Sequence, residues 1–286
     1  MLELKEVKKV YNSFTLDVSL SVPKGQIVGL VGANGAGKST TFKSILHLIR
    51  PRSGSIELFG TETMGRDLTK KERERLGVVL SDSGFFIYLT ASDIMMVQQA
   101  MYPSFEKDRF LKLCRELEIP LDKQIKDFST GMKAKLKVAA ALCHKADLLI
   151  LDEPTAGLDV IARDTVLDLL RDYLDEREDA SILISSHISS DLESICDSFY
   201  MIHDGSIIFH EDTDVLLSEY AVLKVTDQQY NDLDKKYIIR VRKENFGWKC
   251  LTHKKRFYAE NYPDAVFENG GIDDLVLMMV KGEVLS

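Results

Sequence analysis

The stretch Gly32-Ala33-Asn34-Gly35-Ala36-Gly37-Lys38-Ser39 decides the fold, because it matches the phosphate-loop pattern GxxxxGK[ST] at every defined position. An apolar run at residues 26–31 precedes it, and a segment with apolar residues at helical spacing follows it and ends at Pro51. A strand before the loop and a helix after it form the setting in which this pattern binds phosphate.

The loop has the chemistry of an anion site. Glycines let backbone N–H groups approach phosphate oxygens, and the N-terminus of the following helix adds a favourable dipole. We expect Lys38 to reach the β- and γ-phosphates of a nucleotide and the Ser39 hydroxyl to bind Mg²⁺. The predicted nucleotide-binding residues of this segment are Gly32, Asn34, Gly35, Ala36, Gly37, Lys38, Ser39 and Thr40.

Two further apolar runs end in residues that suit phosphate chemistry. Residues 148–151 lead into Asp152 and Glu153, and residues 181–185 are soon followed by His187. A carboxylate at the end of a buried strand beside a phosphate loop is placed to hold Mg²⁺, and a second can polarise water. His187 is then a candidate γ-phosphate contact. The plainer alternatives are a solvated turn for the acids and a surface position for the histidine.

The order of the elements predicts the class of fold. Residues 1–22 alternate apolar and polar side chains, which indicates two antiparallel strands. Residues 90–147 are predicted to be mostly helical, starting from a capping box of Thr90 and Asp93. Short buried strands that alternate with helices predict a mostly parallel α/β sheet. After residue 215 the composition shifts to short β-like runs and a closing apolar helix at 272–280.

Composition excludes several classes of protein. The 37 Lys and Arg against 45 Asp and Glu give a net charge of −8, which does not favour a polyanion binder. The four cysteines lie far apart without metal-ligand spacing, which fits a reducing compartment, and Cys114 falls on the apolar face of a predicted helix. No apolar run approaches the roughly 18–20 residues of a spanning helix, so we expect a cytoplasmic chain.

Over residues 1–215 the chain resembles the nucleotide-binding subunits of ABC transporters. Five segments occur in that family's order: the phosphate loop at 32–39, FSTGM at 128–132, LLILDEP at 148–154, GLD at 157–159, and His187. The resemblance implies an α/β fold: a P-loop ATPase core with a mostly parallel sheet, an antiparallel β subdomain and an α-helical subdomain at about 85–147. Residues 216–286 would form a small α+β extension for dimerisation or regulation.

The resemblance also implies catalytic roles. Glu153 would be the general base, Asp152 the Mg²⁺-associated acid and His187 the switch histidine of an ATPase whose cofactors are ATP and Mg²⁺. Tyr11 matches the aromatic residue that stacks on adenine, although it could simply be a strand residue. Ser81 falls about where the family has Gln or Glu near Mg²⁺ and the attacking water. Ser81 would reach either group only through another water, and Asp82 could substitute for it.

A second subunit is part of the same expectation. Ser129 and Gly131 would contact the γ-phosphate of ATP held by the other subunit of a head-to-tail dimer, and Asp159 would lie in the loop that links the two sites. Thr130 and Met132 depart from the commonest signature, LSGGQ, and resemble exporter-type forms. The dimer could be a homodimer or a heterodimer with a paralogous ATPase subunit.

Two surface segments bear on partners. The cluster Phe85-Phe86-Ile87-Tyr88 could be buried core or part of a groove for a membrane subunit. Residues 235–256 carry nine Lys and Arg and one acid, which most simply make a solvated face. Contact with an anionic membrane leaflet is the next interpretation, and nucleic-acid binding is the least favoured one.

These observations predict an ATP-binding and ATP-hydrolysing subunit that powers translocation, in the export direction, through separate transmembrane permease subunits. Such a chain would lie in the cytoplasm, peripheral on the inner face of the cell membrane. The main alternative is a soluble ABC-type ATPase of cofactor assembly or another non-transport complex. A sensor module that has lost hydrolysis is a third, which Ser81 keeps open.

Overall fold

The computed structural model describes residues 1–284, which form two sheets with helices around them. The strands of the large sheet are β1 (Leu2–Val10), β2 (Thr15–Val22), β3 (Ile27–Val31), β4 (Ser53–Leu58), β5 (Thr61–Glu62), β6 (Leu76–Val79), β7 (Leu148–Asp152), β8 (Ser181–Ser185), β9 (Ser198–His203) and β10 (Ser206–Asp212). Their order across the sheet is β5-β4-β1-β2-β10-β9-β3-β8-β7-β6. The predicted α/β class, with a parallel core and an antiparallel part, is confirmed.

The parallel part of this sheet positions the site. Strands β6, β7, β8, β3 and β9 run parallel, and every residue of β3, β7 and β8 is buried. Parallel strands covered on both faces are apolar throughout, which explains the continuous apolar runs in the sequence. In the register of the sheet, Asp152 pairs with Ser185 and Leu30 pairs with Ser185 from the other side. The chain therefore leaves β3 into the phosphate loop directly beside the ends of β7 and β8.

The antiparallel part begins with the predicted pair β1 and β2, which is confirmed. Leu2 pairs with Val22 and Val10 with Thr15, and β4 pairs with the other edge of β1. Helix α1 (Lys38–Ile45) follows the phosphate loop and ends earlier than predicted. His47 has a φ of +56°, and such a left-handed residue cannot continue a right-handed helix.

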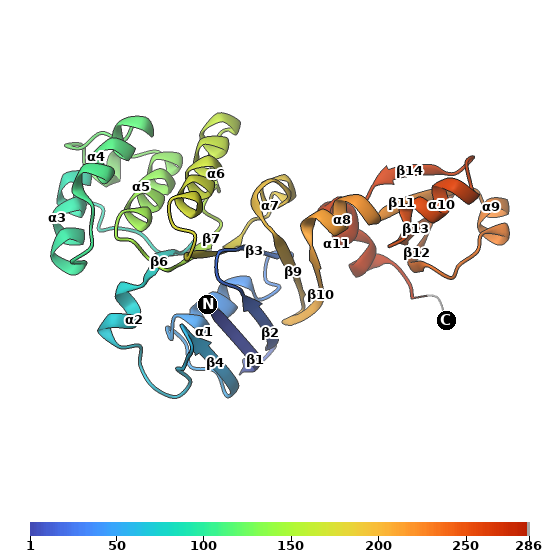
Figure 1. The fold of residues 1–286 in the computed structure, drawn as a ribbon, viewed down its shortest axis with the longest axis horizontal. Coiled ribbons are helices and arrows are strands. Elements are labelled where there is room, and N and C mark those ends of the chain that lie inside the picture. Colours follow the sequence, from blue (N-terminus) through green and yellow to red (C-terminus); the bar gives the residue numbers. More distant parts are fainter. Residues whose placement is uncertain (285–286) are drawn as a thin grey trace.

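Four longer helices form the layer at the upper left of Figure 1: α3 (Ala91–Met101), α4 (Lys107–Glu116), α5 (Thr130–Leu142) and α6 (Val160–Asp175). Shorter helical pieces are α2 (Lys70–Glu74), the 3₁₀ turn η1 (Ile125–Asp127) and α7 (Ser189–Ile195). The predicted capping box is present, because Thr90 Oγ1 accepts the N–H of Asp93, whose carboxylate accepts the N–H of Thr90. Cys114 is core, as predicted, and burial raises the pKa of its thiol to about 11.

The C-terminal lobe lies at the other end of the elongated ribbon (Figure 1). Its elements are α8 (Thr213–Glu219), β11 (Ala221–Val225), α9 (Asp227–Asp232), β12 (Ile238–Glu244), β13 (Gly247–Thr252), α10 (Lys255–Asn261), β14 (Val266–Asn269) and α11 (Ile272–Lys281). The strands form an antiparallel sheet in the order β12-β13-β11-β14. The predicted strands and closing helix are therefore present. Ile272, Leu275 and Met278 of α11 are buried in the same core cluster as Leu192 and Ile195 of α7.

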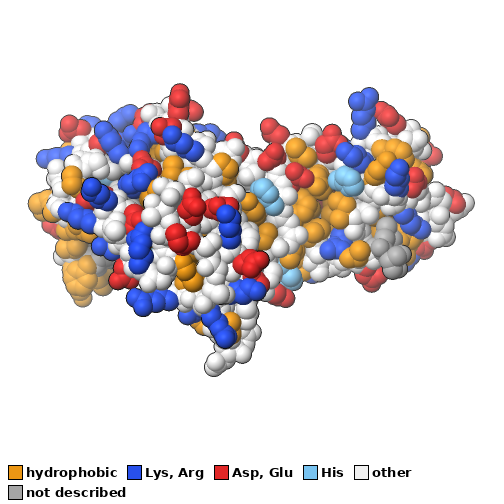
Figure 2. Space-filling view, turned by 60° about the horizontal axis from the view of Figure 1, so that its bottom comes forward, with side chains coloured by type: hydrophobic (Ala, Val, Ile, Leu, Met, Phe, Trp, Pro, Cys, Tyr) orange, Lys and Arg blue, Asp and Glu red, His pale blue; other side chains and the backbone are white. Residues whose placement is uncertain are grey.

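The surface is mixed in charge, with apolar side chains gathered in places. Figure 2 shows hydrophobic side chains at the end of the molecule that carries α3 and along the waist before the C-terminal lobe. Of the apolar cluster at 85–88, Phe85 packs against the core, whereas Phe86, Ile87 and Tyr88 are exposed. Among residues 1–284, no helix combines the length and apolarity needed to cross a membrane.

Candidate functional site

Most of the predicted phosphate-loop and strand-end residues line a cleft of about 390 Å³ at the carboxyl ends of β3, β7 and β8. The phosphate loop forms one wall, and Ser81, Asp152, Glu153 and His187 come from the ends of other strands. The lining residues are Ala33, Asn34, Gly35, Gly37, Lys38, Ser39, Thr40, Ser81, Asp152, Glu153, Ala156 and His187. A crevice beyond the carboxyl ends of parallel strands is the usual ligand position in an open α/β sheet.

The phosphate loop needs its glycines for close packing. Gly37 has a φ of +120°, and a Cβ there would lie 2.9 Å from Cδ1 of Leu16. A Cβ on Gly32 would lie 2.4 Å from the carbonyl oxygen of Ile202. The backbone consequently wraps the start of α1 without intruding side chains, which keeps its N–H groups available to an anion.

The ammonium of Lys38 lies inside this loop. The residue is 6% exposed, and its Nζ donates to the carbonyl of Gly32 at 2.7 Å. It also lies 3.7 Å from Glu153 Oε1. A buried ammonium with loop carbonyls and one carboxylate around it is a suitable partner for phosphate oxygens.

Asp152 accepts three hydroxyl groups. Ser39 and Ser81 each donate to its Oδ2 at 2.7 Å, and Ser185 donates to its Oδ1 at 2.7 Å. Asp152 is only 1% exposed, so these hydrogen bonds offset the cost of burying the carboxylate. Hydroxyl and carboxylate oxygens are the ligands that Mg²⁺ prefers, so the donor set fits that ion.

Ser185 is a site residue that the sequence analysis missed. Its hydroxyl joins both acids, since it donates to Asp152 and accepts the backbone N–H of Glu153 at 3.1 Å. Its position at the end of the apolar run 181–185 is the only signal that the sequence carries. The sequence analysis also did not foresee that Ser81 donates directly to Asp152.

Glu153 and His187 form a close pair across the cleft. Oε2 of Glu153 lies 2.5 Å from Nδ1 of His187 and accepts the backbone N–H of His187 at 3.0 Å. The carboxylate accepts, so the ring carries its hydrogen on Nδ1 in this contact. Glu153 has a φ of +54°, a strained conformation for a residue with a side chain. The surrounding structure therefore holds this carboxylate in place at an energetic cost.

Side chains of two helices, α1 and α5, hold the loop after β6 in place. Lys43 of α1 binds the carboxylate of Asp82, and this contact holds the pKa of Asp82 below its usual value. Lys137 of α5 donates to the carbonyl of Leu80 at 3.0 Å, and burial lowers its pKa. Asp82 is thus engaged with α1, and Ser81 is the residue of this loop that reaches Asp152. The structure gives no support to a substitution by Asp82.

The signature segment lies outside the cleft of its own chain. Ser129 caps α5 by accepting the N–H of Met132 at 3.2 Å, and Asp159 caps α6 by accepting the N–H of Ala162 at 2.9 Å. Gly131 lies against the loop that precedes Asp159. The structure therefore joins Gly131 to the 157–159 loop but does not bring Ser129, Gly131 or Asp159 to the phosphate loop of the same chain.

Tyr11 lies at the turn between β1 and β2. The residue is 43% exposed, and its ring centroid lies 6.3 Å from that of Phe14. Cζ of Phe14 in turn lies 3.2 Å from the position that a Cβ on Gly37 would take. The turn that carries Tyr11 consequently lies next to the phosphate loop, although Tyr11 itself is not among the residues that line the cleft.

Comparisons with known proteins agree with this geometry. Residues 15–156 match the family model described as ABC transporter. The ABC transporter ATP-binding protein YtrB of Bacillus subtilis is 34% identical over 227 residues, which cover 79% of this chain and 76% of that protein. The lantibiotic transport ATP-binding protein SrtF of Streptococcus pyogenes is 36% identical over 218 residues, or 75% and 92% of the two chains.

Solved structures extend the likeness to three dimensions. The structure of an ATP-binding subunit of an ABC transporter matches with a TM-score of 0.69 at 31% identity, and the match covers 76% of this chain and 91% of that one. A dimeric bacterial ABC transporter cassette at 22% identity has a TM-score of 0.67 and supports the fold. The chain therefore belongs to the ABC transporter family, as one of its ATP-binding and ATP-hydrolysing subunits.

Proposed function

We propose that the cleft holds ATP with Mg²⁺ and that the residues around Asp152 and Glu153 carry out hydrolysis. Lys38 binds the β- and γ-phosphates, while Ser39, Asp152 and Ser81 form the oxygen-rich side that suits Mg²⁺. When bound, Mg²⁺ supplies positive charge next to the phosphates. The convergence of three hydroxyls on the buried Asp152, beside Lys38 and Glu153, is the observation that carries this proposal.

Glu153 acts as the general base in this proposal. Its carboxylate takes a proton from the attacking water, whose oxygen bonds to the γ-phosphorus as the bond to the leaving ADP oxygen breaks. The left-handed backbone at Glu153 and its contacts with His187 orient the carboxylate before substrate arrives. His187 is the switch residue of the pair, and Tyr11 provides the face for adenine from the neighbouring turn.

A second subunit completes the site. Ser129 and Gly131 are placed at the first turn of α5, where free N–H groups attract a γ-phosphate held by the partner. Val160 and Ile161, directly after Asp159, are 71% and 81% exposed. Apolar side chains that stand free beside the loop support a face that a second subunit covers, in a homodimer or with a paralogous chain.

Export through separate permease subunits is the transport that we propose. Three relatives carry names that concern antimicrobial compounds: lantibiotic transport, bacitracin transport and linearmycin resistance. These names favour export of a compound of that kind over a role in cofactor assembly. The exposed Phe86, Ile87 and Tyr88 on the helical subdomain at 85–147 suit contact with a permease, which would hold the chain at the inner face of the membrane. Residues 1–215 form the ATPase domain in this proposal, and residues 216–286 the accessory one.

The test is a Glu153→Gln chain, tagged and purified with ATP from solubilised source membranes. We expect it to bind ATP, to hydrolyse it very slowly and to accumulate as an ATP-bound dimer together with a multi-spanning membrane protein. Lys38→Ala, prepared in parallel, should lose ATP binding and the dimer because it lacks the buried ammonium. Normal turnover by Glu153→Gln would refute the role of the base, and a soluble partner complex in repeated preparations would refute the transport role.

A further inference from the structure

The closing helix α11 exchanges hydrogen bonds with α7, the short helix directly after His187. Oγ of Ser189 donates to Oδ1 of Asp273 at 2.5 Å, and the N–H of Ile272 donates to Oε1 of Glu193 at 2.6 Å. Neither helix receives a side-chain hydrogen bond from its own N-cap residue. Glu193 therefore caps a backbone N–H in the first turn of α11, whereas Asp273 accepts the side-chain hydroxyl of Ser189, the first residue of α7.

On its opposite side α7 is tied to the segment that follows Glu153. Asp191, 2% exposed, accepts the hydroxyl of Thr155 at 2.8 Å and lies 3.2 Å from Nε of Arg163. His187 lies two residues before the start of α7, and its backbone N–H and ring both contact Glu153. Asp191 therefore ties α7 to the segment after Glu153, and Ser189 ties it to α11 of the C-terminal lobe.

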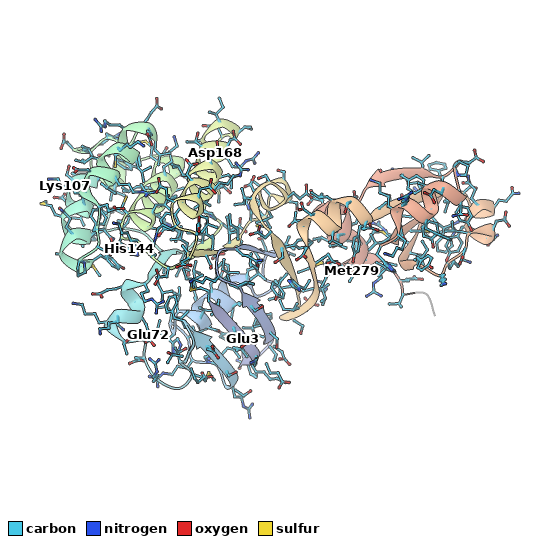
Figure 3. The ribbon with its side chains drawn as sticks, viewed as in Figure 1. Glu3, Glu72, Lys107, His144, Asp168 and Met279 are labelled. Carbon is cyan, nitrogen blue, oxygen red and sulfur yellow. The ribbon has the colours of Figure 1, made fainter. Side chains whose placement is uncertain are left out.

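Apolar packing also joins α7 to α11. Ile272, Leu275 and Met278 of α11 are buried in the same core cluster as Leu192 and Ile195 of α7, and the two helices are in contact. Figure 3 marks α11 by Met279, on the side of the lobe that faces the ATPase body. Because packed side chains fix the position of α11, Asp273 is held where it accepts the hydroxyl of Ser189.

We propose that Asp273 is a positioning residue for ATP hydrolysis, which acts through Ser189 and α7 on the placement of His187. The inference rests on the proposed function, since it requires His187 to contribute to the hydrolytic step. It assigns the C-terminal lobe a part in the reaction of its own chain, separate from any part in dimerisation. Binding of ATP is not affected, because Lys38 and the phosphate loop have no contact with α11 among the contacts of the described residues.

Removal of the lobe would not test this inference, because it would expose the buried face of α7. The test uses point variants of the whole chain: Asp273→Ala removes the acceptor, Asp273→Asn retains an acceptor oxygen, and Asp274→Ala alters the adjacent carboxylate. We expect Asp273→Ala to lower kcat about three- to tenfold with KM for ATP within twofold, since displacements of about 1 Å near reacting groups cost up to 10²-fold and Asp191 still holds α7. Asp273→Asn should recover most of the activity, and Asp274→Ala should leave kcat within twofold.

The His187→Ala background separates the two claims. His187→Ala alone should lower kcat, and adding Asp273→Ala to it should produce no further loss, because both changes act through the same side chain. Ser189→Ala should reproduce Asp273→Ala if the latter misfolds, and thermal melting checks the fold of each variant. A normal kcat for His187→Ala would overturn the switch role itself. A fall with His187→Ala but unchanged kcat for Asp273→Ala and Ser189→Ala, or additive losses in the double variant, would overturn the positioning role alone.

Discussion

The Ser81 hydroxyl gives the sharpest prediction about the site, because it binds the buried carboxylate of Asp152 directly. Ser81→Ala removes one of the three hydroxyls that Asp152 accepts and leaves those of Ser39 and Ser185. A hydrogen bond to a charged group contributes about 1.5–3 kcal/mol, and the low end applies because two donors remain. A loss of about 1.5 kcal/mol corresponds to roughly a tenfold change in a rate or binding constant.

The assay is steady-state ATP hydrolysis at fixed ATP over a range of Mg²⁺ concentrations. Ser81→Ala should lower kcat divided by the half-saturating Mg²⁺ concentration about tenfold, and Ser81→Thr should stay near the parent because it keeps the hydroxyl. Ser83→Ala is the matched control, since the Ser83 hydroxyl donates to the carbonyl of Leu80 at 3.2 Å in the same loop. If Ser81→Ala remained within twofold of the parent, the assignment of Ser81 to the acid would be refuted.

Two further predictions concern the phosphate loop and the helical layer. Gly37→Ala should cost about 2–3 kcal/mol of stability and abolish tight ATP binding, because Gly37 has a φ of +120° and an added Cβ would lie 2.9 Å from Leu16. Gly35→Ala should cost only about 1 kcal/mol, because Gly35 has a φ of +82° but no atom within 4 Å of an added Cβ. Urea unfolding compares the two variants, and equal losses of stability would contradict the packing role of Gly37. His144, at the foot of α5 in Figure 3, is 2% exposed and burial lowers its pKa, so the unfolded chain takes up its proton first as pH falls below about 6.5 and stability drops. Urea unfolding at pH 7.5, 6.5 and 5.5 should show a smaller drop for His144→Gln, and an unchanged slope would contradict this assignment.

The site residues that lie within one sequence segment could be predicted from the local pattern alone. The phosphate loop, Asp152 and Glu153 could be predicted because each follows a short apolar run that reads as a buried strand, and strand ends meet at one edge of a parallel sheet. The capping box of Thr90 and Asp93 is equally local, since its two hydrogen bonds span three residues.

Contacts that depend on strand register, or that join residues far apart in the chain, could not be predicted from the sequence. Ser185 touches Asp152 because β7 and β8 pair in the register that places these two residues side by side, and one residue of slip would turn Ser185 away. Asp273 meets Ser189 across 84 residues of chain, after a complete second sheet has been built. The end of α1 was predicted too late for a different reason: the apolar spacing continues, but the backbone at His47 turns left-handed.

The C-terminal lobe begins where the composition changes, but its closing helix α11 packs in the same core cluster as α7. Ile272, Leu275 and Met278 are at most 1% exposed and belong to a core cluster that extends from the parallel sheet and α7 into the lobe itself. Full burial of such a side chain stabilises a protein by roughly 1.5–3 kcal/mol, so the three together contribute roughly 4.5–9 kcal/mol to a core that includes residues of α7 and of the lobe itself. Part of the packing of α11 is therefore on the core that includes α7, the helix that begins two residues after His187. In the positioning role that we propose for Asp273, a change in the lobe would act on hydrolysis through α7 and leave the phosphate loop undisturbed.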